Sequence, residues 1–260
     1  MPSTRTDQPG EDIPATDGVA HHLANLRDVG GMPTVDGGRT RPGVLWRADA
    51  PLAGDRSEGP GGLAWPPGSV VDLRNPSELR EPHPLPALGS GLTALPLIES
   101  LAPAEQARGR RGELGAGELY LLLVDIGASW LPSLVRVAAY GPGPLLVHCA
   151  AGKDRTGVAV ALLLRAAGVD RATVAADFAA SNDRRVALRD RLVVQGAVDP
   201  DVEADRIGVT PAHLEPVLDL LDDDPRAPLR DAGVPDADLD AWRARLVEDG
   251  AASRTAHEGA

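Results

Sequence analysis

The only cysteine and the only lysine of this 260-residue chain lie four residues apart, within residues 148–157, which read HCAAGKDRTG. A short glycine-containing loop between a strand and a helix can wrap a tetrahedral oxyanion, because its N–H groups and the positive end of the helix point to one spot. Cys149 would lie at the bottom of this cup, where the positive field favours the thiolate, the attacking form of cysteine. Arg155 can hold two anion oxygens at once, and Thr156 can donate a hydrogen bond to the sulfur.

The spacing of cysteine, five residues and arginine therefore predicts a phosphate site with a resident nucleophile. Lys153 adds a second cation at the rim, which suits substrates with more than one phosphate. A carboxylate facing a phosphate dianion is repelled, so we expect Asp154 to point aside or to position water. The residues predicted to bind the phosphate are Ala150, Ala151, Gly152, Lys153, Asp154 and Thr156.

The segments on either side of the loop have the patterns that this geometry requires. Residues 143–148 read as a turn and a short buried strand, and residues 156–168 as an apolar helix that ends at a glycine. Transfer of a phosphoryl group to sulfur also needs an acid that protonates the leaving oxygen. Asp72 ends a predicted strand, at the edge where open α/β sheets bind ligands, and is the candidate acid.

Two alternatives stay open for the residues around the nucleophile. Asp72 can instead form an ion pair with Arg74, and Asp154 is a rival acid. His148 precedes Cys149 on a strand and should point away from the cup. We therefore expect His148 to orient the loop through hydrogen bonds and to help keep the sulfur ionised, with a general-base role as the alternative.

Three blocks, in this order along the chain, carry a resemblance to a known family: NLRDVGG at 25–31, VVDLRNPSE at 70–78, and the loop. With these blocks the chain resembles the bacterial tyrosine/serine protein phosphatases related to mycobacterial protein tyrosine phosphatase B, which are cysteine-based CX5R enzymes. The resemblance implies catalysis by Cys149, Arg155 and Asp72 through a phosphocysteine, without a cofactor or a metal. It also implies a phosphorylated protein as substrate, carrying phosphotyrosine and, for a dual-specificity enzyme, phosphoserine or phosphothreonine. A similar Gly-Lys-x-Arg loop in phosphoinositide phosphatases adds a phosphoinositide as a candidate.

Composition narrows the classes of partner. The formal net charge is -12, so the average surface repels nucleic acid and anionic membranes, and an anionic substrate must be attracted by a local field. A single cysteine excludes an internal disulfide. No charged-then-apolar leader and no run of 18 apolar residues occurs, which predicts a soluble, cytoplasmic protein without membrane insertion. Export without a leader stays open.

Strand patterns alternate with helix patterns, which predicts an α/β domain with a central parallel or mixed sheet flanked by helices and a helical C-terminal part. The expected division is a disordered segment 1–18, one phosphatase-like domain over 19–248 and a frayed tail 249–260. Strands are expected at 44–49, 69–73 and 92–98. Residues 99–116 are polar with a poor helix signal, and they are a candidate lid.

Two other classes of protein use a reactive cysteine or an anion-binding loop for a different function. A rhodanese-like sulfur transferase and an arsenate reductase also hold a cysteine in such a loop, but a reductase usually needs a second, resolving cysteine. A phosphate-binding module without catalysis is the non-enzyme alternative, and the intact pair of Cys149 and Arg155 argues against it.

Overall fold

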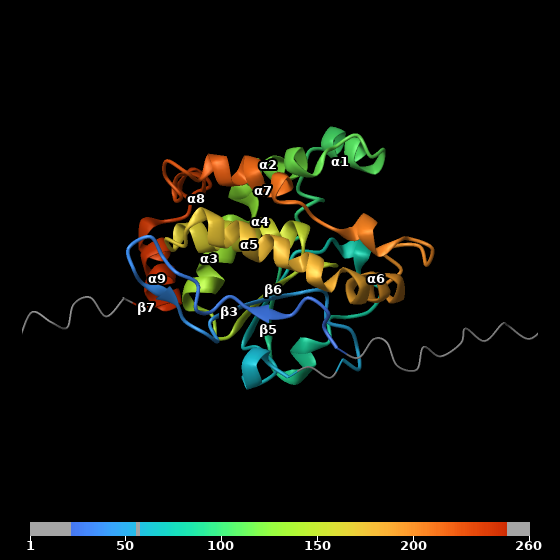
Figure 1. Cartoon of the computed structure of the whole chain (residues 1–260), viewed down its shortest axis with the longest axis horizontal. Helices are drawn as coiled ribbons and strands as arrows, with labels where there is room; N and C mark the ends of the chain where they lie inside the picture. The colour runs from blue at the N-terminus through green and yellow to red at the C-terminus, as the bar shows by residue number, and fades with distance from the viewer. Residues whose placement is uncertain (1–21, 56–57, 249–260) are drawn as a thin grey trace, which may run out of the picture.

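A computed structural model describes residues 22–55 and 58–248 (Figure 1). Five strands form one sheet in the order β1-β3-β6-β4-β5, in which β1 runs antiparallel to β3 and all other neighbours are parallel. The predicted α/β class with a mostly parallel central sheet is confirmed. The expected disordered segment 1–18 and frayed tail 249–260 lie outside the described residues. The strands are β1 (Arg27–Asp28), β3 (Leu45–Ala48), β4 (Ser69–Asp72), β5 (Gly91–Ala94) and β6 (Leu145–His148).

Apolar residues make up half or more of each of the three central strands, which suits burial on both faces. Every residue of β3, β4 and β6 is buried. In the register of the sheet, His148 at the end of β6 pairs with Ala48 on one side and with Asp72 on the other. Chain segments that follow these three strands therefore meet at one edge of the sheet.

The edge strand β5 is shorter than the strand expected over 92–98. It ends at Ala94, two residues before Pro96, which has no N–H to continue a ladder. Its side chains are mostly exposed, in contrast to those of β4 beside it.

Helices cover one face of the sheet (Figure 1). Among the described residues, those that pack against Trp46, Val70 and Leu146 on the other face come from short 3₁₀ turns and loops. No described helix combines the length and the apolar character that crossing a membrane would need. The helices are α1 (Pro103–Arg110), α2 (Ala116–Asp125), α3 (Leu131–Tyr140), α4 (Asp154–Ala166), α5 (Arg171–Ala179), α6 (Arg185–Val194), α7 (Pro211–Leu220), α8 (Ala227–Asp231) and α9 (Asp236–Leu246).

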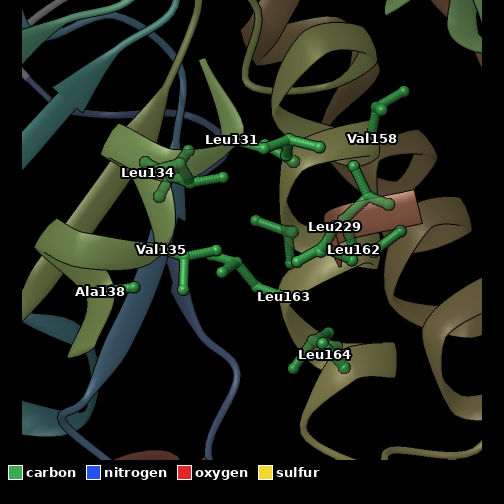
Figure 2. Close-up of a cluster of buried hydrophobic side chains, with 14 of the residues drawn as sticks. Leu131, Leu134, Val135, Ala138, Val158, Leu162, Leu163, Leu164 and Leu229 are labelled. Atoms are coloured by element: carbon green, nitrogen blue, oxygen red, sulfur yellow. The ribbon is translucent and has the colours of Figure 1, made fainter. Parts of the chain in front are cut away.

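Helix α4 lies at the centre of the helical layer. Every residue from Thr156 to Ala166 is buried. Figure 2 shows Val135 of α3 facing Leu163 of α4, and Leu162 of α4 beside Leu229 of α8. Burial of a leucine side chain stabilises the fold by roughly 2 kcal/mol, so these contacts anchor the helix whose first turn follows the loop.

Two segments differ from the expectations. Helix α1 forms within residues 99–116 despite the poor helix signal, because Pro103 starts it and Arg108 bridges Glu105 and Glu118 across its surface. The C-terminal part, expected to be helical, also contains a short strand. Helix α9 ends at Leu246, and the next two residues form β7 (Val247–Glu248), which pairs with β2 (Arg39–Thr40).

Candidate active site

The predicted anion loop follows β6, the central strand, and leads directly into α4. Cys149 is buried at 2% exposure, and the helix begins at Asp154. Gly152 has a φ of 65°, and a Cβ atom there would lie 2.0 Å from the carbonyl oxygen of Ala48. Only glycine fits this turn and this close approach.

The carbonyl oxygens of the loop accept hydrogen bonds from groups around it. Because the C=O and N–H groups of one trans peptide point in opposite directions, carbonyls held outward turn the loop amides inward. Within the described chain, no acceptor contacts the amides of residues 150–153. The donor and acceptor pairs are Leu73 N to His148 O (2.9 Å), His148 Nδ1 to Cys149 O (3.2 Å), Ala50 N to Ala150 O (3.0 Å), Asn25 Nδ2 to Ala151 O (3.1 Å) and to Gly152 O (3.0 Å), and Arg47 Nη2 to Gly152 O (2.9 Å).

A buried charge cluster supports the loop from the side of β1, β3 and α5. Arg47 donates to Asp177 at 2.5 Å, and Arg27 donates to the same carboxylate at 2.8 Å. Burial alone would raise the pKa of Asp177, but the charges of Arg47 and Arg27 outweigh it and lower that pKa. The ionised carboxylate therefore holds Arg47 against the loop carbonyl of Gly152.

Arg27 and Asp28, the neighbouring charges of the first block, bind different partners. Arg27 bonds to Asp177, whereas the carboxylate of Asp28 accepts from the amides of Gly30 (2.8 Å) and Gly43 (2.5 Å). The reason is strand geometry: consecutive side chains of a strand point to opposite sides.

Arg155 reaches back from α4 to the segment that follows β4. Its two terminal nitrogens each donate to Glu78 at 2.6 Å, and Nη1 also donates to the carbonyl oxygen of Leu73 at 3.2 Å. Of its five N–H groups, Nε–H and one on Nη2 have no acceptor among the described residues. These two form the side-on pair that matches two oxygens of a phosphate. Glu78 therefore fixes the guanidinium and leaves its other edge for an anion.

The sequence comparisons identify the family. A sequence profile of the tyrosine phosphatase family matches residues 19–248. The chain belongs to this family.

Several relatives carry phosphatase names. A protein of Cupriavidus necator named putative tyrosine-protein phosphatase is 28% identical over 207 residues, which is 76% of this chain and 72% of that protein. The triple specificity protein phosphatase PtpB of Mycobacterium tuberculosis is 44% identical over 73 residues, 27% of this chain and 26% of its own length. A tyrosine-protein phosphatase of Nostoc commune is 50% identical over 46 residues, 18% of this chain and 16% of its own. The protein is a phosphatase enzyme of the protein-tyrosine-phosphatase type.

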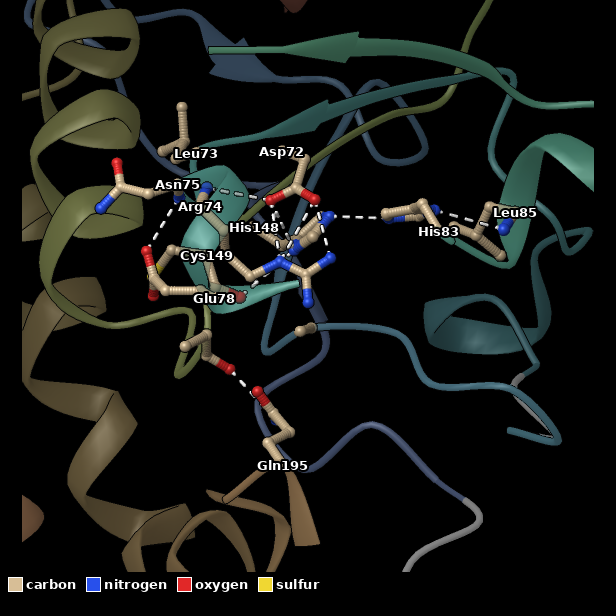
Figure 3. A network of polar contacts seen from close by, with 12 residues as sticks. Asp72, Leu73, Arg74, Asn75, Glu78, His83, Leu85, His148, Cys149 and Gln195 are labelled. Atoms are coloured by element: carbon tan, nitrogen blue, oxygen red, sulfur yellow. Dashed lines mark hydrogen bonds and ion pairs between the residues drawn. The ribbon is translucent and has the colours of Figure 1, made fainter. Parts of the chain in front are cut away.

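In this phosphatase Asp72 is held in an ion pair, which was the alternative to its role as the acid. Its two carboxylate oxygens accept from Nε (3.0 Å) and Nη2 (2.7 Å) of Arg74, and Nδ1 of His148 lies 3.8 Å away (Figure 3). Burial favours the neutral acid, but the neighbouring His148 ring and the hydrogen bonds and charge of Arg74 outweigh it and lower the pKa of Asp72 to about 2. An ionised carboxylate in a two-pronged ion pair has no proton to give.

Asp154 lies at the other side of the loop, beside Tyr120. The hydroxyl of Tyr120 donates to Oδ1 of Asp154 at 2.5 Å, and the Asp154 side chain is 37% exposed. Burial raises the pKa of Tyr120 well above its usual value, and the charges of Asp154 and Cys149 add to this. The neutral tyrosine therefore orients the Asp154 carboxyl beside the cup.

The remaining predicted residues have more local roles. Lys153 donates to the carbonyl oxygen of Ile207 at 2.7 Å and lies 3.4 Å from Asp154, so its ammonium is tied down and is not a mobile rim charge. The hydroxyl of Thr156 is buried and has no hydrogen-bond partner among the described residues, so the expected bond to sulfur is not formed in this structure. His148 points away from the cup, toward His83 and Asp72, as expected from its place on the strand (Figure 3).

A cavity of about 320 Å³ lies between the segments that follow β3 and β4 and the end of α6. Pro51, Leu52 and Val194 supply apolar wall, and Glu78 and His83 line it too. Its residues follow β3 and β4 or end α6, so it opens at the same edge of the sheet as Cys149.

Sequence reasoning missed three side chains that shape the site. No role was predicted for Glu78 in the second block. It lies three residues after Asn75, a spacing typical of the start of a helix, and in the structure it accepts a hydrogen bond from the Asn75 amide at 2.8 Å. Asp177 is a lone carboxylate within an apolar helix, a pattern that indicates a buried ionic partner. His83 had no signal, because nothing local distinguishes it from a surface histidine.

Proposed function

We propose that this enzyme hydrolyses phosphomonoesters, phosphotyrosine first among them, through a phosphocysteine intermediate and without a metal ion. The carrying observation is the loop itself: a buried cysteine, inward-facing amides and an arginine with two N–H groups left for an anion. Residues 19–248 would act as one phosphatase domain.

In the first step the Cys149 thiolate attacks phosphorus, the sulfur–phosphorus bond forms and the phosphorus–oxygen bond to the leaving group breaks. Arg155 and the loop amides stabilise the charge on the three equatorial oxygens. The leaving oxygen takes a proton from an acid. In the second step water attacks phosphorus and gives a proton to the deprotonated acid, the sulfur–phosphorus bond breaks, and inorganic phosphate and the thiolate are released.

Asp154 is the acid that the geometry supports better, in place of Asp72. Asp154 is partly exposed at the cup and oriented by Tyr120, whereas Asp72 is buried, ionised and paired with Arg74. A proton donor acts where it can reach the leaving oxygen. Asp72 would then orient Arg74 and His148.

Leaving-group dependence tests this assignment. Asp154→Asn should lower turnover about 100-fold or more for phenyl phosphate, a poor leaving group, and about tenfold or less for nitrophenyl phosphate. Asp72→Asn should lower both to the same extent. The reverse pattern would return the role of the acid to Asp72, and equal losses for both substrates in both variants would exclude both.

Cys149→Ser tests the nucleophile and separates the alternative functions. It should lower turnover at least about a thousandfold while vanadate or phosphate still binds. Turnover that persists in Cys149→Ser, or that disappears from the wild type with a chelator, would overturn the mechanism. Thiosulfate turnover without phosphate release would indicate a sulfur transferase, and binding without turnover in the wild type would indicate a phosphate-binding module.

Substrate breadth is a separate part of the proposal. A relative over 73 residues is named a triple specificity phosphatase, which supports testing phosphoseryl, phosphothreonyl and phosphoinositide substrates beside phosphotyrosyl peptides. The decisive comparison is kcat/KM across that panel at one pH and ionic strength. Turnover confined to phosphotyrosyl peptides would leave the tyrosine-specific function alone.

A further inference from the structure

A chain of hydrogen bonds leads from the wall of the cavity to the backbone of the nucleophile. Leu85 N lies 3.2 Å from Nδ1 of His83, and Nε2 of His83 lies 2.9 Å from Nε2 of His148. Nδ1 of His148 lies 3.2 Å from the carbonyl oxygen of Cys149 (Figure 3).

The Leu85 amide determines where the protons in this chain lie. A backbone N–H can only donate, so Nδ1 of His83 must accept, and the proton of the neutral ring lies on Nε2. That proton is donated to Nε2 of His148, which must accept. The proton of His148 then lies on Nδ1 and is donated to the Cys149 carbonyl.

We propose that His83 is a positioning residue: by donating to Nε2 of His148 it keeps that imidazole neutral with its proton on Nδ1, and so holds the Cys149 carbonyl away from the cup. The peptide that carries this carbonyl also carries the N–H of Ala150. Since the two groups of a trans peptide are antiparallel, the same bond turns the Ala150 N–H toward the bound anion.

Burial and charge agree with two neutral rings. His148 is fully buried, and burial lowers its pKa; Asp72 opposes this effect, whereas Arg74 and Arg155 add to it. Burial and the adjacent His148 ring lower the pKa of His83 to about 4; Asp72 opposes this shift, and the charge of Arg74 adds to it. These are the charged and titratable groups that face the pair.

The same residues resemble a set of metal ligands, but their hydrogen bonds argue against a bound metal ion. Asp72, His83 and His148 have ligand-type atoms within 4.8 Å of one another. A metal between the two rings would need a lone pair on Nε2 of His83, and the Leu85 N–H places a proton there instead. Arg74 already occupies both oxygens of Asp72.

Three variants of the full chain separate the role of His83 from simple packing. His83→Gln keeps an amide N–H near the position of Nε2, His83→Phe keeps the size of the ring without a donor, and His22→Gln changes an exposed histidine as the control. Nitrogen NMR of labelled histidine rings, followed from pH 5 to 8, reports the protonation and tautomer of His148 directly.

We expect a neutral His148 with its proton on Nδ1 throughout this range in the wild type, in His83→Gln and in His22→Gln. In His83→Phe the unpaired Nε2 should take up a proton within the range. Turnover and vanadate affinity should fall about five- to tenfold in His83→Phe and less than twofold in His83→Gln, because one of several amides loses its orientation.

Several results would overturn the proposal. They are a proton on Nε2 of wild-type His148, a His148 that titrates alike in wild type and His83→Phe, or a His83→Gln that behaves as His83→Phe. Activity lost in His83→Phe with an unchanged His148 spectrum would show a packing role only. Only the kinetic readout of this proposal rests on the proposed phosphocysteine chemistry. The NMR measurement needs no turnover, so it tests the role of His83 even if the proposed function is wrong.

Discussion

The ion pairs on the two flanks of the anion loop differ in burial. On the flank of β1, β3 and α5, Asp177 binds Arg27 and Arg47, and the Arg47 and Asp177 side chains are 1% and 4% exposed. On the flank after β4, Glu78 binds Arg155 at 30% and 12% exposure and lines the cavity. Loss of one partner from a buried ion pair lowers the free energy of unfolding by several kcal/mol, whereas the charges of a partly exposed pair stay accessible to solvent and substrate. The first flank should therefore determine stability, and the second should determine turnover.

The largest expected effect tests the buried flank. Asp177→Asn leaves the charge of Arg47 buried without its counter-ion, so the free energy of unfolding should fall by about 3–5 kcal/mol. Thermal or denaturant unfolding measures it. The matched control is Asp205→Asn, because the exposed pair of Asp205 with Arg185 should be worth less than about 1 kcal/mol. Equal losses in the two variants would remove the distinction between buried and exposed pairs on which the comparison depends.

Glu78→Gln tests the open flank. The guanidinium of Arg155 loses its charged anchor, so kcat/KM should fall about 10- to 100-fold while the free energy of unfolding changes by about 1 kcal/mol or less. Steady-state kinetics and denaturation of the same preparation give both numbers. A variant that is destabilised as strongly as Asp177→Asn but turns over normally would reverse the assignment of the flanks.

The dependence of stability on pH sharpens the comparison on the open flank. The pKa of His83 is lowered from 6.5 to about 4 in the folded protein, so between these values the unfolded chain binds a proton that the folded protein does not. Stability should thus fall as pH decreases from 6.5 to 4, by at most about 1.4 kcal/mol per pH unit for this group. His83→Gln removes this part of the slope, and the difference between the two proteins isolates it from other groups. Identical slopes would mean that His83 titrates normally.

The smallest effect concerns Lys153, which belongs to neither flank. Its bond to Ile207 and its proximity to Asp154 predict a several-fold loss of kcat/KM in Lys153→Ala, on the order of 1 kcal/mol. The loss should be similar for phosphotyrosyl and phosphoinositide substrates, because the ammonium is tied down. A loss confined to phosphoinositides would restore the role of a rim cation that the sequence suggested.

Elements that depend on neighbouring residues were predictable from the amino-acid sequence. One continuous segment contains the strand 145–148, the loop with its obligatory Gly152 and the buried helix from Thr156. The cap at Asp170 is equally local, because its side chain accepts from the Thr173 amide at 2.9 Å. Turn residues, apolar runs and caps act over a few residues, so they can be read without the fold. For the same reason the α/β class was predictable from alternating patterns.

The side chains that act together around the loop could be identified only from the three-dimensional fold. Asp72 had two local interpretations, and the position of Arg74 after the end of β4 selects the ion pair. Glu78 meets Arg155 across 77 residues and His83 meets His148 across 65, because parallel pairing of β4 with β6 brings the segments after both strands to one edge. Partners of this kind are set by the register of the sheet and by burial, and neither is encoded within a short stretch of the chain.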